Sequence, residues 1–178
     1  LLRMLFGLIQ PDAGEFSVFG RTWKDAGVGV LDGVAGFIES PRFYPYLTGR
    51  QNLKGLGRLD GGVPKGLLEE VLEVVDLTDR ADRKVGGYSY GMKQRLGVAA
   101  SLLRQPRLLV LDEPANGLDP AGIRWMRDLL RGYANEGGTV LLSSHLLNEI
   151  ERVADEIVVI GHGKIVAHGT KEIGRAHV

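Results

Sequence analysis

Residues 89–120 read SYGMKQRLGVAASLLRQPRLLVLDEPANGLDP and decide the fold of this chain. Apolar residues recur at helical spacing in the first half, which predicts a helix over residues 92–104 that ends before Pro106. These apolar residues are Met92, Leu96, Ala99, Ala100 and Leu103. The continuous apolar run at residues 108–111 then predicts a central strand that is covered on both faces.

Two acids, Asp112 and Glu113, follow the predicted strand at once. They stand at its carboxyl end, where open α/β sheets bind their ligands. Because successive side chains of a strand point in opposite directions, the two acids cannot do the same job. One acid can hold a metal ion while the other orients a water molecule.

The remaining elements are predicted from the same periodicities and from their caps. We expect helices at residues 1–9, from Thr48 to about 56, at 67–75, from Asp119-Pro120 to Gly137-Gly138, and around Leu146, Ile150 and Val153. We expect strands at residues 15–19, 36–38 and 139–143, and a hairpin of 156–160 with 164–168. Residues 27–36 are rich in glycine, but Asp32 stands where a dinucleotide fingerprint needs its third glycine, so we expect a loop there.

Four motifs of the chain resemble those of ABC ATPases. Residues 88–95 (YSYGMKQR) resemble the signature motif, residues 108–114 (LLVLDEP) the Walker B strand, residues 116–120 (NGLDP) the D-loop, and residues 143–145 (SSH) the switch histidine. Their order and spacing are those of the family. The resemblance covers nearly the whole chain, except for its last few residues and a missing front.

The resemblance implies an α/β fold of the P-loop NTPase type, with a mostly parallel sheet flanked by helices and an inserted helical subdomain. The ATPase domain would be partial and span residues 1–170, with the helical subdomain at about 42–88 and the signature helix at 89–105. Residues 171–178 resemble the translation of a sequencing adapter, and we expect them to be a non-native tail. The first helix lacks a cap and a starting Met, so we also expect the chain to be truncated at its N-terminus.

The phosphate-binding loop of the family, G-x-x-x-x-G-K-[ST], does not occur in the printed sequence. Its one Gly-Lys pair, Gly163-Lys164, is followed by Ile165 rather than Ser or Thr. We therefore expect the 178 residues to lack half of their nucleotide site. We also expect the strand at residues 108–111 to lose a neighbour in the sheet.

By the resemblance, ATP and Mg²⁺ are the ligands, and ATP is sandwiched between two subunits. Asp112 holds Mg²⁺, mostly through water, and Glu113 is the general base or orients the attacking water. His145 contacts the γ-phosphate, although a lone histidine is more often structural. Ser89 and Gly91 act on the nucleotide of the other subunit. The alternative interpretation of these two residues is a plain helix cap.

Other motif residues depart from the family pattern or have a second interpretation. Glu39 stands at the Q-loop position, where the family usually has glutamine. Its carboxylate can still accept a hydrogen bond from metal-bound water. The alternative is that Glu39 is only a solvated acid in a loop. Tyr90 and Met92 replace the commoner Gly and Gln, so phosphate contacts rest more on Ser89 and backbone amides. Asp119 would lie across the dimer seam.

Aromatic residues follow the Q-loop position at Phe43, Tyr44 and Tyr46. Such residues are usually buried, yet Pro41 and Pro45 interrupt regular structure here, which makes an exposed aromatic patch plausible. In ABC ATPases this region faces the coupling helix of the transmembrane partner.

Composition excludes several classes of protein. The 178 residues carry 22 acids and 22 bases, so bulk charge does not suggest a nucleic-acid partner. There is no cysteine, which excludes disulfides and thiolate metal sites. No apolar run approaches the ~18 residues of a membrane span, so we expect a cytoplasmic domain that reaches the membrane only through a partner.

Residues 44–53 (YPYLTGRQNL), with Glu39 before them, look most like ATPase subunits of ABC-2-type exporters, including those of antibiotic resistance. This implies an ATP-hydrolysing subunit at the inner face of the cell membrane. Its partners would be a transmembrane permease and a second ATPase subunit, identical or paired. Two alternatives stay open: a soluble ABC ATPase of translation or DNA repair, and an inert fragment that cannot bind ATP.

Overall fold

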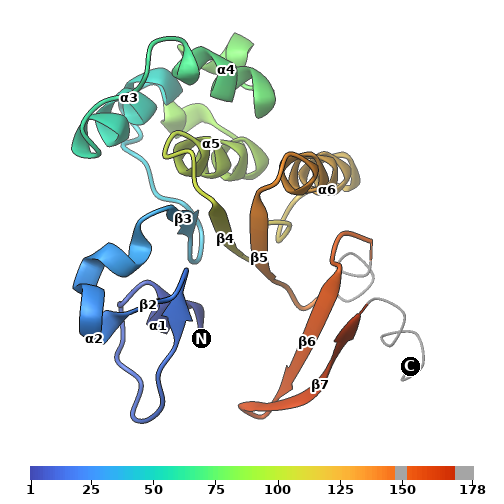
Figure 1. Cartoon of the computed structure of the whole chain (residues 1–178). Helices are drawn as coiled ribbons and strands as arrows, with labels where there is room; N and C mark the ends of the chain where they lie inside the picture. The colour runs from blue at the N-terminus through green and yellow to red at the C-terminus, as the bar shows by residue number, and fades with distance from the viewer. Residues whose placement is uncertain (147–151, 171–178) are drawn as a thin grey trace.

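The computed structural model describes residues 1–146 and 152–170, and its centre is a parallel three-stranded sheet (Figure 1). The strand order is β3 (Val34–Phe37), β4 (Leu108–Asp112) and β5 (Thr139–Ser143). In this register Asp112 lies opposite Ser143. The predicted α/β class with a parallel sheet is confirmed.

The central strand β4 is buried on both faces, as its apolar sequence predicted. Leu109 and Leu111 belong to the larger core, whereas Val110 and Leu108 pack in a second core on the other face. The expected loss of a neighbour is wrong, because β4 pairs with β3 on one side and with β5 on the other.

Helices α5 (Tyr90–Leu102) and α6 (Pro120–Asn135) cover one face of the sheet (Figure 1). Helix α5 begins earlier than the predicted residue 92, because the hydroxyl of Ser89 caps it by accepting a hydrogen bond from the Met92 N–H, at 3.2 Å. Of its apolar stripe, Leu96, Ala99 and Leu103 are buried, whereas Met92 and Ala100 are partly buried.

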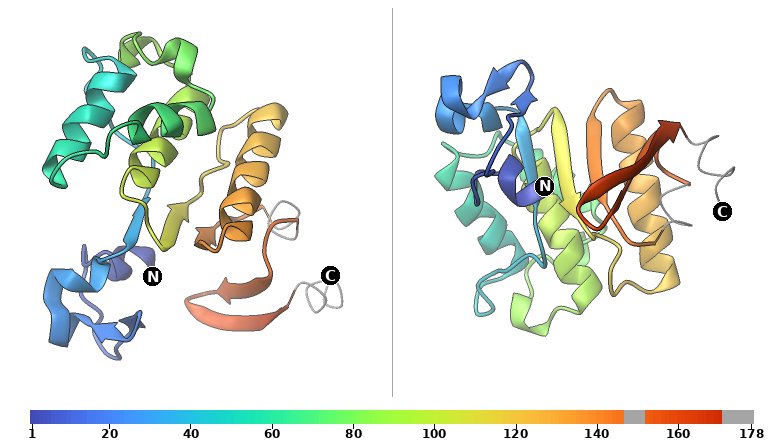
Figure 2. Two further views of the ribbon diagram at one scale, coloured as in Figure 1. Left: turned by 45° about the horizontal axis from the view of Figure 1, so that its top comes forward. Right: turned by 90° about the horizontal axis from the view of Figure 1, so that it is seen from below.

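Helices α3 (Gly49–Leu59) and α4 (Leu67–Val74) lie beyond α5, farther from the sheet (Figures 1 and 2). A capping box of Thr48 and Gln51 starts α3 at the predicted place, and the helix runs three residues past the predicted end. Two short 3-10 helices, Thr78–Arg80 and Val85–Gly87, lead back to α5.

The N-terminal segments form small elements on the opposite face of the sheet (Figure 2). In chain order they are α1 (Leu2–Leu5), β1 (Ser17–Val18), β2 (Arg21–Thr22), α2 (Trp23–Ala26) and a 3-10 helix (Gly27–Leu31). The predicted helix at 1–9 is thus a single turn, and the predicted strand at 15–19 is two residues of a hairpin with β2. The glycine-rich run is half helical rather than a loop, since its first part forms the 3-10 helix.

Strands β6 (Glu156–Gly161) and β7 (Lys164–Thr170) form the predicted antiparallel hairpin, in a sheet separate from the central one. The helix predicted around Ile150 falls partly on residues 147–151, outside the described residues, as does the tail at 171–178. Within the described ranges, no helix is both long and apolar enough to cross a bilayer.

Candidate functional site at the carboxyl edge of the sheet

The two acids diverge at the end of β4. Asp112 is the last residue of the strand, and Glu113 has a φ of +48°, in the left-handed region. This uncommon conformation turns the chain away from the strand direction. The N–H of Glu113 still donates to the carbonyl of Ser143, at 3.0 Å, so the turn stays attached to β5.

Ser143, at the end of β5, lies between the two acids. Its hydroxyl donates to Oδ1 of Asp112 and lies 3.3 Å from the Glu113 N–H, from which it accepts. In the sequence this serine is seen only as part of the SSH motif at residues 143–145. Its position opposite Asp112 depends on the register of two parallel strands, for which the sequence carries no separate signal.

His145 lies beside Glu113. Nδ1 of the histidine is 2.9 Å from Oε2 of the glutamate, and the two side chains are 63% and 33% exposed. The structure therefore brings three predicted site residues, Asp112, Glu113 and His145, to one edge of the sheet. Their separate roles stay predictions.

Glu39 follows β3 at the same edge and is also left-handed, with a φ of +65°. Its exposed carboxylate forms an ion pair with Arg3 of α1. Within the described residues, no hydrogen bond or ion pair joins Glu39 to Asp112 or Glu113. Arg3 was missed from the sequence, because the contact spans 36 residues.

Ser89 and Gly91 lie at the N-terminus of α5, next to the segment before α6. A Cβ on Gly91 would come within 3.3 Å of Cδ2 of Leu118. The first-turn N–H groups of a helix lack intrahelical acceptors and attract anions. In the part of the chain that the structure describes, no polar contact connects these two residues with the acid pair.

Asp119 caps α6, as its sequence position predicted. Its Oδ1 accepts from the N–H of Gly122, at 2.7 Å, and Pro120 occupies the first helical position. The carboxylate thus has a structural contact within this chain. Its expected place at a dimer seam stays a prediction.

The donors at this edge fit Mg²⁺ and phosphate in chemical type. Residues 1–146 and 152–170 contain no group of three or more acids and histidines that could enclose a metal. Mg²⁺ needs no such cage, since it usually binds one or two carboxylates together with waters and substrate phosphates. Asp112 suits that mode, and His145 and the α5 N-terminus are suitable phosphate donors.

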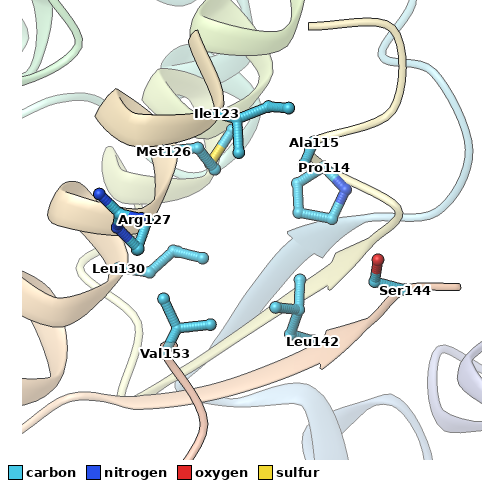
Figure 3. Close-up of a pocket in the computed structure, with 9 residues that line it drawn as sticks. All are labelled: Pro114, Ala115, Ile123, Met126, Arg127, Leu130, Leu142, Ser144 and Val153. Carbon is cyan, nitrogen blue, oxygen red and sulfur yellow. The ribbon is translucent and has the colours of Figure 1, made fainter. Parts of the chain in front are cut away.

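A small apolar pocket lies between α6 and the end of β5 (Figure 3). Its volume is about 30 Å³, which is room for a water molecule or two but not for a nucleotide. The residues that line it are Pro114, Ala115, Ile123, Met126, Arg127, Leu130, Leu142, Ser144 and Val153. The nucleotide site is therefore not this pocket.

Known proteins match both the sequence and the fold. The bacitracin transport ATP-binding protein BcrA of Bacillus licheniformis is 43% identical over 166 residues, which are 93% of this chain and 54% of that protein. The lantibiotic transport ATP-binding protein SrtF of Streptococcus pyogenes is 39% identical, over 93% of this chain and 71% of that protein. A solved structure described as the ATP binding subunit of an ABC transporter has a TM-score of 0.83 and 29% identity, covering 98% of this chain and 75% of that one.

The chain spans about half the length of the first curated relatives that it matches. The sequence model of the family described as ABC transporter matches residues 1–116 of the 178. This match covers more than half of the chain and includes the signature helix and the strand with its acid pair. The agreement of family model, relatives and fold shows that the chain belongs to the ABC transporter family, as an ATP-binding domain.

Proposed function

We propose that the whole subunit hydrolyses ATP at the carboxyl edge of the central sheet. The observation that carries this proposal is the contact between His145 and Glu113, beside Asp112. Glu113 would orient a water molecule and accept its proton, and His145 would donate to a phosphate oxygen. Mg²⁺ would supply charge neutralisation of the phosphates, and Asp112 would hold it.

Two such subunits would enclose ATP between them. The N-terminus of α5, with Ser89 and Gly91, offers amide donors to the nucleotide of the second subunit. Asp119 would lie at the seam between the subunits, and Glu39 would accept from metal-bound water. The second subunit is either identical or a paired homologue.

The transport role rests on the relatives, whose names assign them to bacitracin and lantibiotic transport. We place this subunit in an ABC-2-type exporter, at the inner face of the cell membrane and bound there by a transmembrane permease. Residues 42–88 would be the inserted helical subdomain that receives the permease.

An exposed aromatic pair supports this docking surface. Tyr44 and Tyr46 are 61% and 64% exposed, with ring centroids 5.7 Å apart. The backbone beneath them is fixed by buried Asn52, which accepts from the N–H of Tyr44 and donates to its carbonyl and to that of Thr48. Tyrosine is among the residues that are enriched at protein interfaces.

The printed chain by itself should not hydrolyse ATP and should bind it only weakly. ATP carries about four negative charges, and the lysine and amides of the phosphate-binding loop compensate most of them in this family. The 178 residues contain no such loop. Isothermal titration with Mg-ATP tests this expectation, and micromolar binding would contradict it.

The decisive test of the ATPase function is Glu113→Gln in the whole subunit. The amide keeps the size of the side chain but cannot accept a proton, so we expect ATP binding to persist and turnover to be nearly abolished. Glu136→Gln, an exposed acid at the end of α6, is the matched control and should keep full activity. Phosphate release within a few-fold of the unmodified subunit would reject the role of Glu113.

A further inference from the structure

Tyr90 stands where three segments of the chain meet. Its hydroxyl lies 3.1 Å from Oγ of Ser40, just after β3, and 3.0 Å from Nε2 of Gln94, one turn along α5. Its ring packs where Gly117 has no side chain, since a Cβ there would come within 3.0 Å of Cε1 of the ring. One side chain thus contacts the turn after β3, the second turn of α5 and the segment before α6.

The hydrogen bonds at this hydroxyl join a buried side chain to an exposed one. The Gln94 side chain is buried, at 2% exposed, and its amide nitrogen can only donate, so the phenol oxygen accepts that bond. Between the phenol and Ser40 either hydroxyl can donate, because the phenol oxygen can accept a second hydrogen bond. In either case the contact fixes the exposed Ser40 hydroxyl in the turn that follows β3.

The neighbouring residue explains why this turn needs support. Glu39 has a φ of +65°, a conformation that persists in residues other than glycine only when their surroundings hold it. One support is the ion pair between Glu39 and Arg3. The side chains of Arg3 and Glu39 are 56% and 62% exposed, and exposed ion pairs contribute little to stability. The contact of Tyr90 with Ser40 is the second support, and it is anchored on buried Gln94.

We propose that Tyr90 is a positioning residue of the nucleotide site. It acts through its hydrogen bond to Ser40, which holds the Glu39 turn against α5. The proposal rests on the ATPase function argued above and adds two residues, Tyr90 and Ser40, to it. Tyr90 itself contacts no ligand in this arrangement.

Conservative variants of the whole subunit test this role. Tyr90→Phe keeps the ring against Gly117 and removes only the hydroxyl, whereas Ser40→Ala removes the other partner. The matched control is Tyr133→Phe, which also loses one phenolic hydrogen bond, to the carbonyl of Pro106 beneath α6.

The readout is kcat and KM for Mg-ATP. We expect Tyr90→Phe to lower kcat/KM about three- to tenfold, the effect of one hydrogen bond, and Ser40→Ala to lower it by a similar factor, because it removes the same contact with the turn. The double variant should be no worse than Tyr90→Phe alone, because that change already removes the contact with Ser40. Tyr133→Phe should leave kcat/KM unchanged.

Unchanged kinetics of Tyr90→Phe in an active subunit, or losses that add in the double variant, would overturn the proposal. An unmodified subunit without activity would count against the ATPase function instead. In that case urea unfolding of the same three variants decides whether the contact exists. A midpoint shift of the double variant that is no larger than that of Tyr90→Phe alone supports it, and additive shifts refute it.

Discussion

Ser143 donates a hydrogen bond from its hydroxyl to the carboxylate of Asp112, across neighbouring parallel strands. The same oxygen accepts from the N–H of Glu113. A single hydroxyl therefore connects the proposed metal ligand with the backbone of the proposed base.

Ser143→Ala should impair activity without unfolding the protein. A hydrogen bond to a charged group contributes about 1.5–3 kcal/mol, so we expect kcat/KM to fall about tenfold or more. We also expect a higher requirement for Mg²⁺, because Asp112 loses its orientation. Magnesium titrations of ATPase activity measure both effects. The neighbouring Ser144→Ala, whose hydroxyl contacts the N–H of Leu146, is the control and should behave like the unmodified subunit.

His145→Ala should reduce turnover by about 10²-fold or more while circular dichroism stays unchanged. The side chain is 63% exposed and contributes little to packing, so its loss removes chemistry rather than a core contact. His162→Ala, in the turn between β6 and β7, is the control. Loss of helical signal in His145→Ala would favour a structural histidine.

Replacing Tyr44 and Tyr46 together by alanine should uncouple transport from ATP hydrolysis. The rings are exposed, so basal activity of the isolated subunit should not change, while permease-dependent transport in vesicles falls. Leu59→Ala removes an even more exposed apolar side chain from the end of α3 and should have no effect. Normal transport by the double tyrosine variant would refute the docking surface.

Gly97→Ala should destabilise the fold by about 1–3 kcal/mol. Helix α5 approaches the turn after β3 closely at this glycine, and an added Cβ would overlap Pro41, with 2.9 Å to its Cβ and 3.3 Å to Cε1 of Phe37. Gly132→Ala, on the open side of α6, meets nothing within 4 Å and should stabilise by about 0.4–1 kcal/mol. Midpoints of urea unfolding compare the two, and equal midpoints would contradict this packing argument.

Local chemistry made much of the fold predictable. The starts of α3, α5 and α6 are marked by Thr48, Ser89 and Asp119, whose side-chain oxygens cap the helices. The run of apolar residues in β4 likewise predicted a strand buried on both faces. The N-terminal elements were overestimated, because apolar residues there pack as short turns on the sheet rather than as one long helix.

The contacts that shape the candidate site were not predictable in the same way. Ser143 with Asp112, Arg3 with Glu39, and Ser40 with Tyr90 are 31, 36 and 50 residues apart. They depend on strand register and on where α1 and α5 lie against the sheet, which no local pattern encodes. The motifs therefore located the acids and the histidine but not the residues that orient them.

The enclosure of β4 between two paired strands and two cores also predicts how slowly its backbone amides exchange with solvent. Amides of a strand that is bonded on both sides and buried on both faces exchange with solvent only when the whole domain opens. Leu109 and Leu111 should therefore be among the last amides to take up deuterium. Asp112 and Glu113 follow directly on this slowest segment. The acid pair would then keep its geometry when helix ends and turns open locally, and would lose it only when the whole domain unfolds.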